Sequence, residues 1–162
     1  MTAAETVRAF LGSFGKSVEQ DHAAYLHYLA DDVHYFSGTS TVCGNEETVA
    51  LAKRAFDMLG LYSWYCEITN LVTDGEVVMT ERQDYQLDEN MKVVLIVPIM
   101  GFFRVRDGKI TEWRDYWDVR ELMAFGEKHR VAKGMPPMQY GDDLGAGARA
   151  VMAAVERSRE AA

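Results

Sequence analysis

The sequence has few of the residues that build disulfide frameworks and metal centres. It contains two cysteines, Cys43 and Cys66, which form neither a Cys-x-x-Cys pair nor a metal-ligand spacing. Its four histidines include no pair at the i,i+4 spacing that chelates a metal on one helix face. We therefore expect two free thiols, as is usual for a cytoplasmic protein, and no metal site.

Long apolar runs and an excess of positive charge are also missing. The longest apolar run, residues 93–103, is far shorter than the roughly 20 residues of a membrane-spanning helix. The start of the chain shows no basic segment followed by an apolar stretch, which is the pattern of a secretory signal. The net charge of −8 disfavours binding to phosphate-rich surfaces. We expect neither a membrane nor a nucleic acid as a partner.

The composition is that of a globular protein with a buried core. Of the 162 residues, 48% are hydrophobic and 26% are charged. We predict a single domain over residues 1–162, with its core between about residues 5 and 128. We expect residues 129–162 to be a C-terminal extension that ends in an alanine-rich helix. The sequence is compatible with that helix packing on the domain or on a partner chain.

Hydrophobic periodicity predicts helices at both ends of the core and strands between them. We expect helices over residues 2–14, 20–29, 45–59 and 119–128, and strands over residues 33–36, 62–72, 77–87, 93–105 and 110–117. Asp107-Gly108 is the strongest hairpin signal. Helices followed by long antiparallel strands indicate an α+β layout. A strongly bent sheet wrapped by the N-terminal helices would form a cone with a cavity.

Two of the predicted strands carry carboxylates in suggestive positions. In Glu81-Arg82-Gln83-Asp84, alternation puts Arg82 and Asp84 on one face of the strand. In the second segment, Asp115 shares its face with Trp113 and Trp117. Two carboxylates with an arginine between them, in an apolar pocket, can hold different protonation states. Such a pair can work as a general acid and a general base.

The hairpin at Asp107-Gly108 predicts which residues surround Asp115. A two-residue turn there pairs residues across the two strands as follows: Val105 with Ile110, Phe102 with Trp113, and Met100 with Asp115. Asp115 would then have apolar neighbours, which would raise the pKa of its carboxyl unless a cation opposes the shift. Arg82 is that cation. For Arg82 to reach Asp115, the loop centred near Met91 must have about five residues, or a bulge must occur, because a two-residue turn would place the two carboxylates on opposite faces.

The two motifs together resemble the limonene-1,2-epoxide hydrolase family. The resemblance rests on Thr80-Glu81-Arg82-Gln83-Asp84 and on Gly108 to Asp118, and covers roughly residues 7–125, including the strand with Tyr35. It implies a cystatin-like α+β cone, in which a strongly curved mixed sheet and N-terminal helices enclose an apolar cavity. Nuclear transport factor 2, ketosteroid isomerases and polyketide cyclases share this fold.

The resemblance also implies a one-step, cofactor-free hydrolysis that gives a vicinal diol. Asp115 would be the general base that deprotonates water, and Asp84 the general acid that protonates the epoxide oxygen. Arg82 would bridge the two carboxylates, and Tyr35 would position the water. Ser37 stands where the family pattern has an asparagine as a third water ligand, and its hydroxyl can hold a water.

The substrate implied is a small apolar epoxide, and we expect a homodimer through the exposed face of the sheet by analogy with this kind of fold. The residues predicted to contact substrate are Met79, Met100, Phe102, Trp113 and Phe125. Two other functions fit the same fold: a polyketide cyclase or ketosteroid-isomerase-like enzyme, and a non-catalytic ligand-binding module. A buried structural ion network is the alternative interpretation of the charged cluster, because such networks also perturb pKa values.

Overall fold

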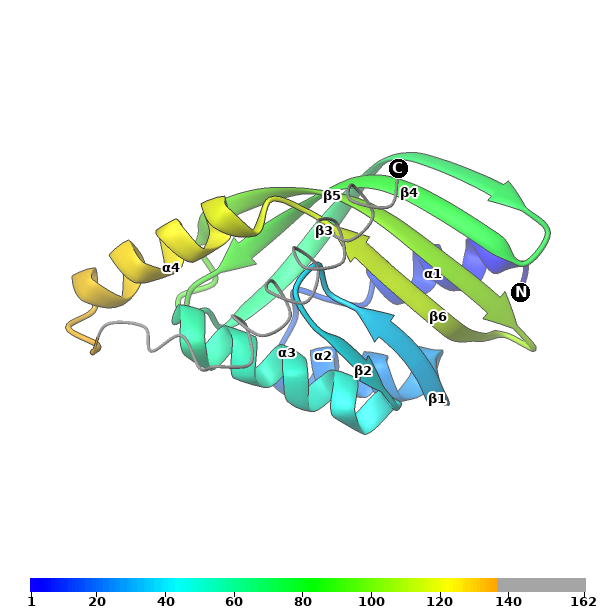
Figure 1. Ribbon diagram of the computed structural model, residues 1–162, viewed down its shortest axis with the longest axis horizontal. Helices are drawn as coiled ribbons and strands as arrows, with labels where there is room; N and C mark the ends of the chain where they lie inside the picture. Colours follow the sequence, from blue (N-terminus) through cyan, green and yellow to red (C-terminus); the bar gives the residue numbers. More distant parts are fainter. Residues whose placement is uncertain (137–162) are drawn as a thin grey trace, which may run out of the picture.

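The structure is a computed structural model that describes residues 1–136, and the predicted terminal helix lies outside these residues. Within them, a mixed sheet of six strands is accompanied by four helices (Figure 1). The helices are α1 (Ala3–Leu11), α2 (Val18–Tyr28), α3 (Asn45–Leu59) and α4 (Val119–Ala132). The strands are β1 (Leu29–Phe36), β2 (Thr41–Cys43), β3 (Ser63–Asp74), β4 (Val77–Leu87), β5 (Val93–Arg106) and β6 (Lys109–Tyr116).

The predicted α+β cone is confirmed. The strands are ordered β2-β1-β6-β5-β4-β3, and all neighbours are antiparallel except β1 and β6, which makes the sheet mixed. The sheet is twisted, and α1, α2 and α3 lie on one of its faces (Figure 1). The short strand β2 falls in residues 37–44, where we expected only a loop; it is three residues long and pairs only with β1.

Aromatic side chains fill the space between the N-terminal helices and the sheet. Helix α1 begins with a capping box formed by Thr2 and Glu5, and it buries Phe10 completely. The Phe10 ring packs edge-to-face on Trp113 of β6, with 5.1 Å between ring centroids. This packing covers the inner face of the sheet at one end and leaves its other end to the cavity described below.

The register of β5 and β6 differs from our prediction by one residue. Val105 pairs with Ile110 as expected, but a bulge between Arg104 and Val105 shifts every later pair. The expected partners of Trp113 and Asp115 are therefore wrong: the structure pairs Phe103 with Trp113 and Gly101 with Asp115.

Three predicted substrate contacts lie on the outer face of the sheet, two of them, Met100 and Phe102, because of this shift. Phe102 and Met100 lie opposite Arg114 and Tyr116, away from the helices. Met79 pairs with Phe102 and also lies on the outer face. It is three residues before Arg82, and alternation therefore puts it on the other face of β4. Met79 and Met100 are 45% and 50% exposed, so these contacts are corrected.

The loop between β4 and β5 has five residues, 88–92, as the sequence predicted. The Asp88 carboxylate closes it by accepting hydrogen bonds from the backbone N–H groups of Asn90 and Lys92, at 2.9 and 3.0 Å. With this loop and a register shift next to Leu87, Arg82 pairs with Ile99. Arg82, Asp84 and Asp115 consequently point to the same, inner face.

Both cysteines are free thiols. None of the helices within residues 1–136 combines the length and the apolar character that crossing a membrane requires.

Candidate active site

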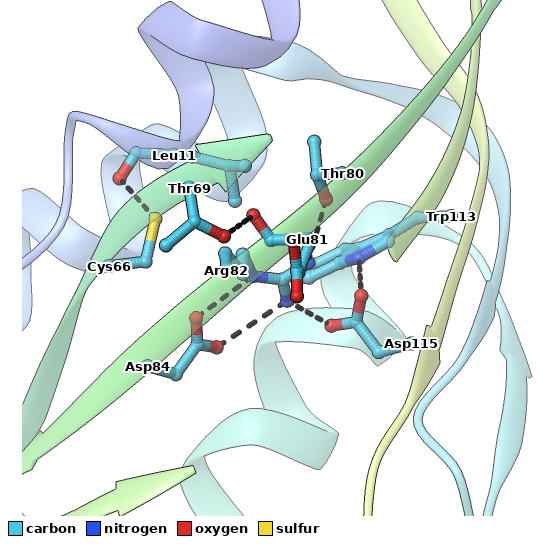
Figure 2. Close-up of polar contacts among 9 residues, drawn as sticks. All are labelled: Leu11, Cys66, Thr69, Thr80, Glu81, Arg82, Asp84, Trp113 and Asp115. Atoms are coloured by element: carbon cyan, nitrogen blue, oxygen red, sulfur yellow. Dashed lines mark hydrogen bonds and ion pairs between the residues drawn. The ribbon is translucent and has the colours of Figure 1, made fainter. Parts of the chain in front are cut away.

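A buried arginine joins the two carboxylates at the inner face of the sheet (Figure 2). The Arg82 Nε donates to Asp84 Oδ1 at 2.8 Å, and Nη2 donates to Asp115 Oδ2 at 2.7 Å. Nη2 also lies 3.4 Å from Asp84 Oδ2. Arg82 is 0% exposed, and the carboxylates are 4% and 3% exposed. These are charge-assisted hydrogen bonds in surroundings that water screens poorly.

The backbone of β5 makes room for the guanidinium. A Cβ at Gly101 would lie 2.6 Å from Thr80 Oγ1 and 2.9 Å from the Phe103 ring, and closer still to Arg82 Nη1. The guanidinium also lies 5.9 Å from the centroid of the Phe103 ring. A glycine at position 101 is therefore needed for the arginine to lie flat against the sheet between the two carboxylates.

The two carboxylates have different environments. Asp115 accepts a hydrogen bond on each oxygen, from Arg82 and from the Trp113 indole N–H, the latter at 2.8 Å. Among residues 1–136, Asp84 has Arg82 as its only side-chain donor. Burial raises the pKa of Asp84 to about 6, although Arg82 opposes the shift. Asp84 is thus the carboxyl suited to carry a proton, and Asp115 is the one with a hydrogen-bond donor on each oxygen.

Tyr35 approaches this cluster from β1. The parallel pairing of β1 with β6 places Tyr35 opposite Trp113, and their rings stack with 4.2 Å between centroids. Burial raises the pKa of Tyr35 well above its usual value, so the hydroxyl stays protonated. Ser37 follows in the β1–β2 loop, where its Oγ donates to the Ser40 carbonyl at 3.4 Å.

The cluster forms one wall of a cavity of about 380 Å³, a size typical of small-molecule sites. The carboxylates, Tyr35, Ser37 and Trp113 all line it, whereas Arg82 lies behind the carboxylates. Most other lining side chains are apolar or aromatic: Tyr25, Leu51, Ala52, Ala55, Phe56, Met58, Leu59, Trp64, Val97, Ile99, Trp117, Leu122 and Met123. Within residues 1–136, no cluster of three metal-ligating side chains occurs.

Phe125 is not among the cavity residues. It stacks on His129 with 5.0 Å between ring centroids and packs beside Leu59 and Leu61, outside the cavity. Its neighbours Leu122 and Met123 line the cavity instead, which shows how α4 is rotated about its axis. Helical periodicity alone could not fix that rotation, since α4 has apolar side chains around much of its circumference.

Sequence reasoning also missed three residues with clear roles in the site. Thr80 accepts a hydrogen bond from the guanidinium, and Gly101 leaves room for it. Gln86 lines the cavity. Strand alternation gave a signal for two of them, because Thr80 and Gln86 share the face of Arg82 and Asp84. Gly101 could be recognised only once the true register of β5 and β6 was known.

Comparisons with known proteins identify relatives that are named epoxide hydrolases. Residues 1–127 match the family described as limonene-1,2-epoxide hydrolase catalytic domain. Epoxide hydrolase EphG of Mycobacterium tuberculosis (strain ATCC 25618 / H37Rv) is 34% identical over 112 residues, which are 68% of this chain and 72% of that protein.

Solved structures agree with these matches. The structure of an M. tuberculosis LEH-like epoxide hydrolase superposes with a TM-score of 0.58 at 32% identity, covering 80% of this chain and 92% of that one. An NTF2-like protein of unknown function from Burkholderia pseudomallei K96243 has a TM-score of 0.62 at 18% identity, covering 76% and 95%, and shows the fold alone. With the family match over residues 1–127, these findings show that the chain belongs to the limonene-1,2-epoxide hydrolase family.

Proposed function

We propose that the protein is a cofactor-independent epoxide hydrolase that adds water to a small, largely apolar epoxide in one step, giving a vicinal diol. The observation that carries this proposal is the bridge from Arg82 to both Asp84 and Asp115 in the wall of an apolar cavity. Family membership supports hydrolysis. No observation favours a cyclase, an isomerase or a non-catalytic binding module.

Asp115 is the general base in this mechanism. Each of its oxygens already accepts one hydrogen bond from the protein, and each has a lone pair left for a water in the cavity. Asp115 takes a proton from that water while the water oxygen forms a bond to an epoxide carbon. Tyr35 and Ser37, which line the cavity, hold the water by their hydroxyl groups.

Asp84 is the general acid. It gives its proton to the epoxide oxygen as the carbon–oxygen bond breaks, so that an alcohol leaves instead of an alkoxide. General acid and general base catalysis each contribute about 10²–10⁴-fold. After the reaction Asp115 carries the proton, and transfer of a proton from Asp115 back to Asp84 restores the resting state.

Arg82 keeps the cluster neutral throughout this cycle. One carboxyl is protonated and the other ionised before and after the reaction, so a single guanidinium always balances a single carboxylate. This matters because an unpaired charge in such a buried place is strongly destabilising. The proton can therefore change sides without creating a net charge.

The pH dependence of diol formation tests the assignment of Asp84. We expect kcat/KM for menthene oxide to decrease as the pH rises through an apparent pKa near 6, with a chelator in the buffer. The general acid must be protonated to act, and the protonated fraction falls above its pKa. The apparent value belongs to the coupled pair of carboxyls. A rate that increases steadily from pH 5 to pH 9 would contradict the assignment.

We further propose that two chains associate through the outer face of the sheet. That face carries large exposed side chains, among them Met79, Ile96, Met100 and Tyr116, which are 45–50% exposed. Apolar side chains gathered in this way usually mark an interface. Sedimentation of the full chain should give the mass of a dimer, and a monomer at micromolar concentration would contradict this proposal.

A further inference from the structure

The inner face of β4 carries four polar side chains in a row, and Gln86 differs from the other three. Arg82 donates hydrogen bonds to both Thr80 and Asp84. Gln86 follows on the same face, is only 8% exposed and lines the cavity. No group in residues 1–136 hydrogen-bonds to its carboxamide. Among those residues, Arg114 Nε is the only side-chain atom that is both fully buried and without a hydrogen-bond partner. The unpaired amide of Gln86 is therefore not fully buried, and it faces open space in the cavity.

The strands beside Gln86 place large, mostly apolar side chains next to it. Its cross-strand partners on β3 and β5 are Trp64 and Leu95. The Tyr62 N–H donates to the Leu87 carbonyl at 2.8 Å, which brings the end of α3, with Leu59, to this part of the sheet. An amide left unpaired in apolar surroundings is unfavourable, so the Gln86 carboxamide is free to pair with water or with a polar group of a molecule that enters the cavity.

Two other polar residues of the cavity, Tyr35 and Ser37, come from β1 and from the loop that follows it. Ser37 donates to the Ser40 carbonyl in the β1–β2 loop. Tyr35 lies against Trp113, beside the catalytic carboxylates. Gln86 is therefore a separate polar position on the other side of Asp84. Side chains two residues apart on a strand are about 7 Å apart.

We propose that Gln86 is a specificity-determining residue that hydrogen-bonds a second oxygen-bearing group, a hydroxyl or a carbonyl, on the epoxide substrate. The inference rests on the proposed function and narrows its substrate class from hydrocarbon epoxides to oxygenated ones. A carboxamide both donates and accepts, so either group fits. The second oxygen lies about 7 Å from the oxygen that Asp84 protonates, which is the spacing of the two side chains on β4.

A matched pair of substrates tests this proposal. Menthene oxide and terpineol epoxide differ by one hydroxyl on the isopropyl substituent. We expect Gln86→Met, which keeps the length of the side chain and removes its polar atoms, to lower kcat/KM for terpineol epoxide about tenfold relative to menthene oxide. Equal effects of the substitution on both epoxides would overturn the proposal.

Binding of unreactive analogues to the wild-type chain gives a second measurement that needs no variant and no turnover. Trp64, Trp113 and Trp117 line the cavity, so their fluorescence reports occupancy. Dihydroterpineol should bind the wild-type chain at least as tightly as menthane, because Gln86 pairs with its hydroxyl. Binding weaker than that of menthane by tenfold or more would overturn the proposal. If the protein hydrolysed neither of the two epoxides, that result would contradict the proposed function. The binding comparison would still decide the role of Gln86.

Discussion

Asp115→Asn is expected to lower kcat/KM for epoxide hydrolysis by about 10²–10⁴-fold, with little change in the binding of dihydroterpineol. An amide has nearly the shape of the carboxylate but cannot take a proton from water. Arg82 and Trp113 orient the two oxygens of Asp115. Asp84 is the other carboxyl among the described residues that line the cavity, and it cannot replace Asp115 as the base because it is needed as the acid. Steady-state kinetics and tryptophan fluorescence measure the two effects separately.

Asp118→Asn is the matched control for this substitution. Asp118 lies three residues further along the same motif and caps the start of α4, where asparagine serves equally well. We expect this variant to keep wild-type activity. If Asp115→Asn retained more than a tenth of the wild-type kcat/KM, Asp115 could not be the general base.

Arg82→Met is expected to lower the free energy of unfolding at pH 7 by about 3–5 kcal/mol and to abolish turnover. The substitution leaves two buried carboxyls facing each other without a cation. Their pKa values in the folded chain should then rise, so that the folded state binds more protons than the unfolded state. Its stability should consequently increase as the pH falls from 7 to 5. Denaturant unfolding at both pH values measures this trend.

Arg106→Met is the control, because Arg106 is exposed and its ion pair with Glu76 lies in solvent. We expect that variant to unfold much like the wild-type chain at either pH. An Arg82→Met variant as stable as Arg106→Met at pH 7, with no dependence on pH, would show that the buried cluster is not held together by charge.

The sequence predicted the cluster of Arg82, Asp84 and Asp115 more reliably than the cavity around it. Arg82 and Asp84 share a face through alternation alone, and the five-residue loop needed to bring them to Asp115 was also predicted correctly. Asp115 was recognised from the strand face that it shares with Trp113 and Trp117, and the family resemblance gave it a role. The register was wrong by one residue, because the bulge between Arg104 and Val105 depends on cross-strand packing and leaves no mark in the local sequence.

The one-residue error in the register of β5 and β6 decided which side chains were expected to contact the substrate. Met100 and Phe102 moved to the outer face, and Gly101 took the place beside Asp115. The side of the cavity formed by α4 was equally hard to predict, since which side of a helix faces inward is settled by its packing. Gln86, in contrast, could have been predicted from alternation, because it follows Asp84 on the same face of β4.

A single-turnover reaction in oxygen-18 water, with enzyme in excess over menthene oxide, tests direct addition of water most directly. Water activated by Asp115 should place one oxygen-18 in the diol in the first turnover and leave the carboxylates of Asp84 and Asp115 unlabelled. Mass spectrometry of the diol and of the peptides that contain these residues gives both results. A first-turnover diol without oxygen-18, together with label in either carboxylate, would contradict the mechanism, because it would require a covalent ester intermediate.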